Sequence, residues 1–346
     1  MDASIAGAPL HDMELSLDEA RAYAARVLEH FNTAPENAAI TARALAAAEA
    51  DGLGTHGLAR LPSYAAMVAA GKIDGHAVPR ARRLTPALVA VDAGNGFAYP
   101  AIDHGLPLVA QAARESGIAL LALRRSSHFG VAGQPVEALA NGGLVGLAFA
   151  NASASIAPWG GKTALFGTNP IAFATPLKDR PPAVVDLSVA KGARGNVLAA
   201  VQRGDATIPE GWAFDPQGNP TTDPKAALAG TMVPMGDAKG TALAFIIEVM
   251  AAALTASTFS FDTPSFFDGK GPPAAVGQVV IAIDPGRLAG DAYLDHLERL
   301  AAAIEREPGA RLPGTRRLTN RARAALHGVK VGASLRRALA GMGFAD

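Results

Sequence analysis

The stretch Gly52-Leu53-Gly54-Thr55-His56-Gly57 has the spacing G-x-G-x-x-G, and its surroundings decide which fold the chain can have. In a Rossmann fold this string follows a strand and opens a helix, whose free amides then meet a pyrophosphate. Here residues 37–51 are rich in alanine and predict a helix that ends at the glycines. Asp74 lies about where a ribose-binding acid would be sought, but without the strand the match is misleading. We therefore expect a glycine-rich helix stop and reject a Rossmann site.

Composition narrows the classes of protein to consider. The chain has 346 residues, 49% of them hydrophobic, which is enough for a large core and about two domains of ~150 residues. Its 31 Lys and Arg balance its 31 Asp and Glu, so no long-range positive field favours nucleic acid. The absence of cysteine excludes disulfides, thiolate nucleophiles and Cys-type metal sites, and it fits a reducing compartment. We expect a cytoplasmic protein without a nucleic-acid partner.

Two segments bear on export and on membranes. Residues Met1–Ile5 lack the basic region and the apolar run of a secretory signal. The most apolar stretch, Thr241–Ser257, is interrupted by Glu248 and falls short of the ~20 apolar residues of a bilayer span. We therefore expect no membrane segment and interpret Thr241–Leu254 as a buried helix.

The N-terminal region predicts helices, and the middle of the chain predicts an α/β sheet. Ser16–Glu19 and Thr33–Glu36 both have the capping-box pattern of a helix start. From about residue 87, short runs of Val, Ile and Leu alternate with helical segments, which indicates a sheet with covered faces whose strands can run in mixed directions. The expected strands are Ala87–Ala93, Ile118–Leu123, Leu144–Ala150, Pro170–Thr175, Ala183–Leu187 and Val279–Ile283. The expected helices of the middle and the C-terminal part are His104–Ser116, Pro135–Asn141, Thr241–Leu254, Asp291–Glu307, Asn320–His327 and Leu335–Ala340.

Several common chemistries lack their motifs. The eight histidines are scattered and no His-Glu-x-x-His occurs, so we expect no metal site. There is also no Gly-x-Ser-x-Gly elbow and no Gly-x-x-x-x-Gly-Lys-Ser/Thr phosphate loop. Metal hydrolase, serine hydrolase and P-loop functions are therefore not supported.

Four segments together resemble the type 2 malate/L-lactate dehydrogenase family, which also includes sulfolactate, ureidoglycolate and cyclic imino-acid oxidoreductases. They occur in the family's order across nearly the whole chain, and each alone would be a weak signal. The segments are Asp51-Gly52-Leu53-Gly54-Thr55-His56-Gly57-Leu58-Ala59-Arg60, Ser126-Ser127-His128-Phe129-Gly130, Pro158-Trp159-Gly160-Gly161 to Phe166-Gly167-Thr168-Asn169-Pro170, and Pro234-Met235-Gly236-Asp237-Ala238-Lys239-Gly240.

The resemblance implies an α/β fold particular to this family, a non-Rossmann nicotinamide-binding fold with a mixed sheet and flanking helices. It also implies a homodimer with the active site near the subunit boundary. In relatives the two ends of the chain form one helical domain, which agrees with the change of sequence pattern near residue 87. We predict a helical domain of residues 1–80 with 290–346 and an α/β cofactor-binding domain of residues 81–289.

Reduction of a 2-oxo acid needs a cation for the carboxylate and a proton donor for the developing alkoxide. The planar fork of Arg60 suits a carboxylate, and the resemblance gives this position that role; otherwise it would be a surface arginine on a helix. His56 and His128 are the candidate acids, because imidazole alone has an unperturbed pKa, about 6.5, near neutrality. Relatives differ in which of the two acts. We favour His56, and a structural, hydrogen-bonded histidine is the alternative at either position.

The remaining site residues are implied by the resemblance. Thr55 is expected to orient His56, and Thr168 to offer a hydroxyl to the substrate, although a turn residue before Asn169-Pro170 explains Thr168 equally well. Lys239 and Gly240 also begin an expected helix, where an ammonium and free amides favour a phosphate. The expected contacts to NAD(P)H are Arg124, Ser126, Ser127, His128, Asp186, Leu187, Ser188, Lys239, Gly240, Pro313, Gly314, Arg316 and Arg317.

Three departures from the family pattern bear on the substrate. Thr55 replaces the more common serine, and Asn196 replaces an aspartate that orients the catalytic histidine in cyclic imine reductases. Asp237-Ala238 before Lys239 resembles members of the sulfolactate dehydrogenase type. We expect a dehydrogenase of a 2-hydroxy acid, with sulfolactate or malate ahead of lactate. The alternatives are a reductase of Δ1-piperideine- or Δ1-pyrroline-2-carboxylate and a catalytically silent family member that binds a metabolite.

The sequence does not fix NAD against NADP. Four arginines near the proposed cofactor segments favour NADP, because a guanidinium can bind the 2′-phosphate. They are Arg124, Arg125, Arg316 and Arg317.

Overall fold

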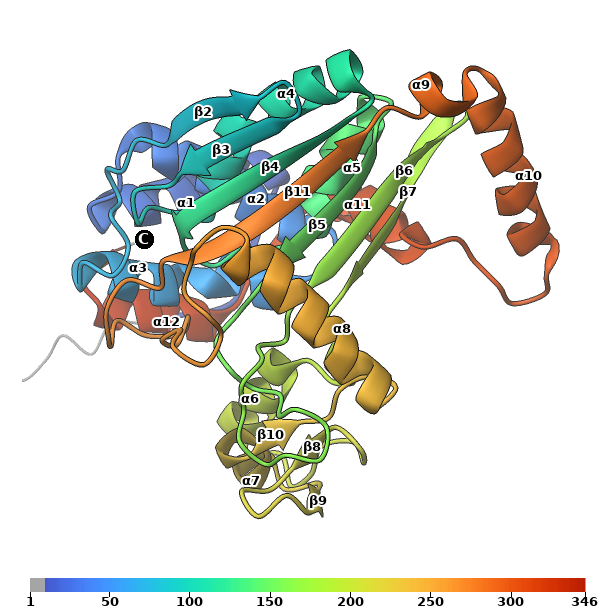
Figure 1. Cartoon of the computed structure of the whole chain (residues 1–346). Helices are drawn as coiled ribbons and strands as arrows, with labels where there is room; N and C mark the ends of the chain where they lie inside the picture. Colours follow the sequence, from blue (N-terminus) through green and yellow to red (C-terminus); the bar gives the residue numbers. More distant parts are fainter. Residues whose placement is uncertain (1–9, 346) are drawn as a thin grey trace, which may run out of the picture.

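The computed structural model describes residues 10–345, and a seven-stranded mixed sheet lies at its centre (Figure 1). The strand order is β2-β3-β4-β11-β5-β6-β7; β3 and β4 are parallel, and all other neighbours are antiparallel. The strands are β2 (Arg80–Thr85), β3 (Leu88–Asp92), β4 (Ile118–Ser126), β5 (Val145–Ala150), β6 (Ile171–Leu177), β7 (Arg180–Leu187) and β11 (Val276–Ile283). The expected mixed α/β fold is confirmed, and all six expected strands are present. Residues Met1–Ile5, where we expect no export signal, lie outside the described part.

The apolar alternation along β11 explains why this strand occupies the middle of the sheet. Val280 and Ala282 face one core, which they share with α4 (Ala98–Ser116) and α5 (Gly133–Asn141). Val279 belongs to a second core on the opposite face, where α8 (Ala238–Glu248) packs. Because both faces are covered, a strand with apolar side chains on each side is stable only in the interior.

The two ends of the chain meet in a third core beside the sheet. It joins α1 (Leu17–His30), α2 (Pro35–Ala50) and α3 (Leu61–Ala69) with α11 (Thr315–His327) and α12 (Ala333–Gly341). β1 (Met13–Leu15) pairs antiparallel with β12 (Val329–Val331) and closes this unit. The domain bounds at residues 80 and 290 stay a prediction.

The helix starts differ in one respect from our expectation. Ser16 and Glu19 form the predicted capping box at the start of α1. The second predicted box is wrong, because Ala34 is the N-cap of α2 and Pro35 its first residue. The Thr33 hydroxyl is buried without a hydrogen-bond partner. Proline at the first helical position, where no amide bond is lost, replaces the side-chain cap.

The remaining elements lie at two margins of the molecule (Figure 1). A small lobe contains α6 (Arg194–Arg203), β8 (Ala213–Phe214), β9 (Pro220–Thr221), α7 (Pro224–Ala229) and β10 (Thr231–Met232). α9 (Pro285–Ala289) leads to α10 (Ala292–Arg306), where Glu298 and Glu305 pair with Arg180 of β7. The expected helix Thr241–Leu254 starts earlier, as α8, and ends in a π-helical turn, Val249–Ala253. The interpretation of this helix as buried is wrong for one side of it, because Phe245, Ile246 and Leu254 are exposed. None of the helices in residues 10–345 combines the length and the apolar character that a membrane crossing needs.

Candidate active site

The glycine-rich stretch ends a helix, as expected. α2 ends at Ala50, and Gly52 has φ +77, the left-handed conformation typical of a helix stop. The chain then forms two 3₁₀ turns, Gly54–His56 and Leu58–Arg60. A Cβ at Gly57 would lie 2.2 Å from the Glu49 carboxylate, which accepts a hydrogen bond from the Leu58 amide at 3.0 Å. The glycines therefore let the chain turn closely over Glu49.

This turn brings four of the predicted residues together. The rings of His56 and His128 stack with centroids 5.5 Å apart. Arg60 Nη2 lies 3.4 Å from His128 Nε2, and Arg60 Nε donates to the Thr55 carbonyl at 3.0 Å. The Thr55 hydroxyl is 3.2 Å from His56 Nδ1. His128 follows β4, so the sheet and the helical unit both contribute to the pocket.

Two tyrosines that we did not predict complete the hydrogen-bond chain. The Tyr64 hydroxyl lies 2.8 Å from His128 Nδ1 and 2.9 Å from the Tyr99 hydroxyl. Because Arg60 can only donate, His128 Nε2 accepts and its proton resides on Nδ1. His128 then donates to Tyr64, and Tyr64 donates to Tyr99. The network fixes the tautomer of His128.

Burial and the charge of Arg60 keep both histidines neutral. Burial, followed by the nearby Arg60, lowers the pKa of His56 to about 4. The same causes, together with His56, hold the pKa of His128 well below its usual range. Burial raises the pKa values of Tyr64 and Tyr99, so both phenols stay protonated.

Arg60 is a buried cation with neutral partners. Only 6% of the residue is exposed. Besides Thr55 and His128, it donates to the Phe266 carbonyl at 3.4 Å, and its Cζ lies 4.5 Å from the centre of the Phe267 ring. No ion pair between Arg60 and an Asp or Glu occurs in residues 10–345. An uncompensated buried charge is costly, so the pocket favours an anion.

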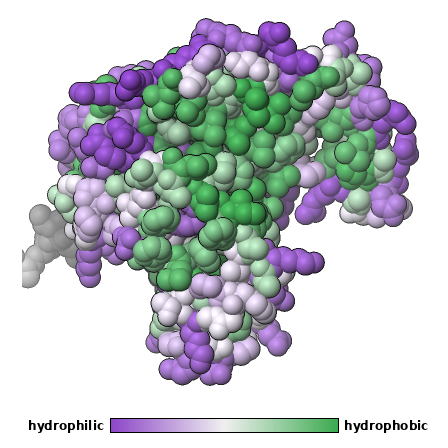
Figure 2. All heavy atoms as spheres, viewed as in Figure 1, coloured by the Kyte–Doolittle hydropathy of each residue, from purple (hydrophilic) through white to green (hydrophobic). Residues whose placement is uncertain are grey.

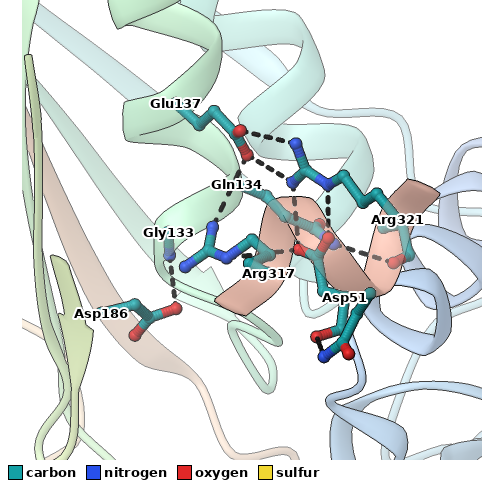
Figure 3. Close-up of polar contacts among 9 residues, drawn as sticks. Asp51, Gly133, Gln134, Glu137, Asp186, Arg317 and Arg321 are labelled. Carbon is teal, nitrogen blue, oxygen red and sulfur yellow. Dashed lines mark hydrogen bonds and ion pairs between the residues drawn. The ribbon is translucent and has the colours of Figure 1, made fainter. Parts of the chain in front are cut away.

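Arg317 lies in a separate buried ion cluster (Figure 3). Its guanidinium is 3.5 Å from both Asp51 and Glu137. Arg321 donates to the same two carboxylates, with Nη1 and Nη2 each 2.6 Å from Glu137 and Nε bonded to Asp51. Asp186 accepts from the Gly133 amide at 2.7 Å, and a Cβ at Gly133 would lie 2.9 Å from Arg317. The cluster therefore joins α11 and α5 to the end of α2.

The other predicted cofactor residues fall into several groups. Arg124 and Arg125 both pair with Asp92, at 2.9 and 2.8 Å. Leu187 and Ser188 close β7, and Pro313 accepts from the Val184 amide of the same strand at 3.3 Å. Ser126 is the last residue of β4 and Ser127 follows it; both are buried. Gly314 is the N-cap of α11, and Arg316 lies in the first turn of that helix.

Lys239 and Gly240 lie in the first turn of α8, where Lys239 is exposed. A Cβ at Gly240 would lie 2.1 Å from the Met235 carbonyl, so glycine is required for the close turn. Thr168 contacts the end of β7, where its carbonyl accepts from the Ser188 hydroxyl at 3.0 Å. Its described hydrogen bonds do not include His56, Arg60 or His128.

The sequence analysis missed four residues of the site, because their contacts with Arg60 and His128 join distant parts of the chain. They are Tyr64, Tyr99, Phe266 and Phe267. Tyr64 is one turn beyond Arg60 on α3, and its position on the same face as Arg60 was the one available signal. Phe266 lies 206 residues from Arg60 in the chain.

The chain was compared with known proteins. The family model for malate/L-lactate dehydrogenase matches residues 15–340. The chain is 50% identical over 303 residues, 88% of it and 90% of the relative, to (2R)-3-sulfolactate dehydrogenase (NADP(+)) of Chromohalobacter salexigens. It is 41% identical over 325 residues, 93% of it and 95% of the relative, to Delta(1)-pyrroline-2-carboxylate reductase 1 of Burkholderia ambifaria.

A solved structure agrees with these sequence matches. The crystal structure of delta1-piperideine-2-carboxylate reductase from Pseudomonas syringae pvar. tomato superimposes with a TM-score of 0.89 and 37% identity, covering 96% of this chain and all of that one. Fold, sequence and the order of the motifs all lead to one assignment: the chain belongs to the malate/L-lactate dehydrogenase family.

Proposed function

We propose that this protein is an NADP-dependent dehydrogenase of a small dianionic 2-hydroxy acid, with 3-sulfolactate or malate as the preferred type of substrate. The observation that carries the proposal is Arg60, a buried guanidinium without a carboxylate partner beside two neutral histidines. A 2-oxo acid brings the missing carboxylate and places its carbonyl oxygen near an imidazole. The planar fork of arginine fixes the plane of that carboxylate.

The residues present suit a nicotinamide cofactor. The Ser126 hydroxyl is buried and has no hydrogen-bond partner within residues 10–345, and the resemblance assigns this residue to the cofactor. The first turn of α8 offers the exposed Lys239 ammonium for a phosphate. When bound, the cofactor supplies or accepts the hydride. The NADP-dependent relative favours the phosphorylated form, and the exposed Arg316 is a candidate for its 2′-phosphate.

His56 is our candidate for the group that exchanges the proton with the substrate oxygen. Nε2 of His128 faces Arg60 as an acceptor, so in this state it has no proton to give. The Thr55 hydroxyl engages Nδ1 of His56, so a substrate oxygen would meet Nε2. Burial is the larger cause of the lowered pKa of His56, and a bound carboxylate would remove the smaller one by offsetting the charge of Arg60, which favours proton exchange at this imidazole. Thr168 is retained as a candidate for a second substrate contact.

Asn196 favours a hydroxy acid over a cyclic imine. Gly195, its neighbour in α6, approaches Thr55: a Cβ at Gly195 would lie 3.9 Å from the Thr55 Cβ. Cyclic imine reductases have an aspartate at the position of Asn196, and this chain lacks that charge near His56. The second candidate function, reduction of Δ1-pyrroline- or Δ1-piperideine-2-carboxylate, is supported by the close match to two reductases of these compounds.

The proposal includes a homodimer that works in the cytoplasm. Large apolar side chains gather over α8 and the segment that follows it (Figure 2), and they include Phe245 and Ile246, 59% and 51% exposed. Phe261, 53% exposed, and Phe267 extend this surface to the pocket of Arg60. A second copy of the chain is the occupant that we propose, because exposed apolar surface of this kind is typical of protein interfaces. The active site would then adjoin the subunit boundary.

A substrate panel tests the proposal directly. Sulfopyruvate, oxaloacetate, pyruvate and the two cyclic imines are assayed with NADPH and with NADH, together with the reverse reaction of each hydroxy acid. We expect the highest kcat/KM for a dianionic oxo acid with NADPH. Turnover of the imines alone would support the second candidate function. Absence of cofactor oxidation with every compound would refute the proposed dehydrogenase activity.

A further inference from the structure

Lys72 lies just beyond α3, the helix that begins directly after Arg60 and carries Tyr64. α3 ends at Ala69, and Gly71, with φ +69, reverses the chain so that the Lys72 amide bonds back to the Met67 carbonyl at 2.8 Å. This helix stop leaves Lys72 only 2% exposed. A lysine so deeply buried needs partners for its ammonium.

All three N–H groups of this ammonium bond to one segment of the chain. Lys72 Nζ donates to the backbone carbonyls of Ser265 at 2.5 Å, Asp268 at 3.1 Å and Lys270 at 2.8 Å. Its acceptors are carbonyls that lie 193 to 198 residues away in the chain. One side chain thus fixes the path of residues 264–270.

A second contact holds the same segment to α3. A Cβ at Gly269 would lie 2.7 Å from the Ala66 carbonyl and 2.9 Å from the Ala70 Cβ. The backbone of the segment therefore approaches the helix at a distance that only glycine allows. Lys72 and Gly269 act at neighbouring points of one packing contact.

The segment contacts the pocket at Arg60 and His128. The Phe266 carbonyl accepts from Arg60 at 3.4 Å, and its ring lies 5.5 Å, centre to centre, from that of His128. The Phe267 ring covers the Arg60 guanidinium at 4.5 Å. A shift of the segment would therefore change the direction of the guanidinium fork and admit water to it.

We propose that Lys72 is a positioning residue: it holds residues 264–270 on α3 as a wall of the acid-binding pocket and so fixes the orientation of Arg60. The inference rests on the proposed function, because it takes Arg60 as the ligand of the substrate carboxylate. Lys72 touches neither the substrate nor the cofactor in this account. It acts through Phe266 and Phe267.

Lys72→Met keeps the length of the side chain and removes the three donors. We expect kcat/KM for the acid to fall by ~10–100-fold, because a misplacement of about 1 Å at a binding group has effects of this size. The KM for the cofactor should stay within about twofold, since the wall borders the acid. The matched control is Lys178→Met, which removes a lysine and its ion pair with Asp295 at the far edge of the sheet.

Hydrogen exchange of the peptide 257–275, followed by mass spectrometry, measures how firmly residues 264–270 are held, and it does not depend on enzymatic activity. Exchange should rise in Lys72→Met and remain at the wild-type level in Lys178→Met. Gly269→Ala should raise exchange and lower kcat/KM in the same way, so it replaces Lys72→Met if that variant does not fold.

Rescue separates positioning from general destabilisation. Because the chain has no cysteine, Lys72→Cys can be alkylated at one site with 2-bromoethylamine in urea and refolded, which restores an ammonium at nearly the same distance. The alkylated protein should regain most of the lost kcat/KM and the slow exchange. A mock-treated Lys72→Cys sample should regain neither.

Wild-type kcat/KM in the folded Lys72→Met and Gly269→Ala variants, or unchanged exchange of the peptide, would overturn the inference. A general loss of folded protein, with full activity in the remaining fraction, would also overturn it. A wild-type protein that turns over no acid would instead refute the proposed function, while the exchange measurement still tests the anchoring by Lys72.

Discussion

Two arginines that contact the two ends of the segment 51–60 have opposite surroundings: Arg60 is buried, and Arg321 is partly exposed but contacts buried carboxylates. Arg321 contacts Asp51 and Glu137, two carboxylates that it shares with Arg317, so two cations meet two anions (Figure 3). Nine residues after Asp51, Arg60 is surrounded by carbonyls, a histidine and an aromatic ring. Both regions bury charged groups, but only in the region of Arg321 do the cations meet carboxylates.

The difference assigns the two regions different tasks. A balanced cluster has all its partners within the fold and holds α2, α5 and α11 together. A buried cation without an anion costs free energy in the folded protein, and that cost is recovered when an anionic ligand binds. Asp51 also begins the turn that presents His56 and Arg60, so the balanced region supports the unbalanced one.

His56→Asn gives the largest effect that we predict in the pocket. Loss of a general acid should lower turnover by ~10²–10⁴-fold, while the thermal midpoint and cofactor binding stay close to wild type. Steady-state kinetics and a thermal melt measure both. His128→Asn is the control; if it abolishes turnover while His56→Asn retains it, the order of the two histidines is wrong.

Arg321→Met should show the reverse pattern. Among the described residues it leaves the buried carboxylates of Asp51 and Glu137 with Arg317 as their sole cation, so we expect the free energy of unfolding to fall by ~1–3 kcal/mol, less than for a fully buried pair because Arg321 is partly exposed. Urea denaturation followed by circular dichroism measures this loss. Arg321→Lys keeps the charge without the bidentate geometry and should lose less. Equal stability of Arg321→Met and wild type would remove the distinction between the two regions.

Lys239→Met extends the comparison of Arg60 and Arg321 to a cation that is exposed. Lys239 lies in the first turn of α8 and is proposed to bind a cofactor phosphate. We expect the dissociation constant for NADPH to rise about tenfold, which corresponds to ~1.4 kcal/mol, with little change in stability or in the bound chemical step. Fluorescence titration measures the affinity. An unchanged affinity would give Lys239 a structural role.

The sequence was sufficient for most of the fold, and the exceptions have physical causes. The six expected strands are apolar runs that lie inside the sheet or along one edge of it. β2 was missed because it is the other edge strand, largely exposed and rich in arginine, so it has no apolar pattern. The start of α4 was missed by six residues, since Pro100 lies in its first turn and masks the helical spacing there.

The pocket was predictable only where its residues are close in sequence. His56, Arg60 and His128 lie in two short motifs, and the fold brings them together. The cluster of Arg317, Arg321, Asp51 and Glu137 was not predicted, because its pairs are 180 to 270 residues apart. Arg317 was expected to meet a cofactor; its Nε and Nη1 face the carboxylates of Asp51 and Glu137, and the cofactor contact stays a prediction.

Arg60→Met tests the central claim, that Arg60 is an unbalanced cation kept for the carboxylate of the substrate. Its kcat/KM for the preferred acid and its free energy of unfolding are measured on one preparation, beside Arg60→Lys. We predict a loss of ~3–5 kcal/mol in transition-state stabilisation for every acid of the panel, with unfolding free energy equal to wild type or higher. Arg60→Lys should also lose activity, because it lacks the fork. A large loss of stability in Arg60→Met with little loss of kcat/KM, or a loss confined to dianionic acids, would contradict the account.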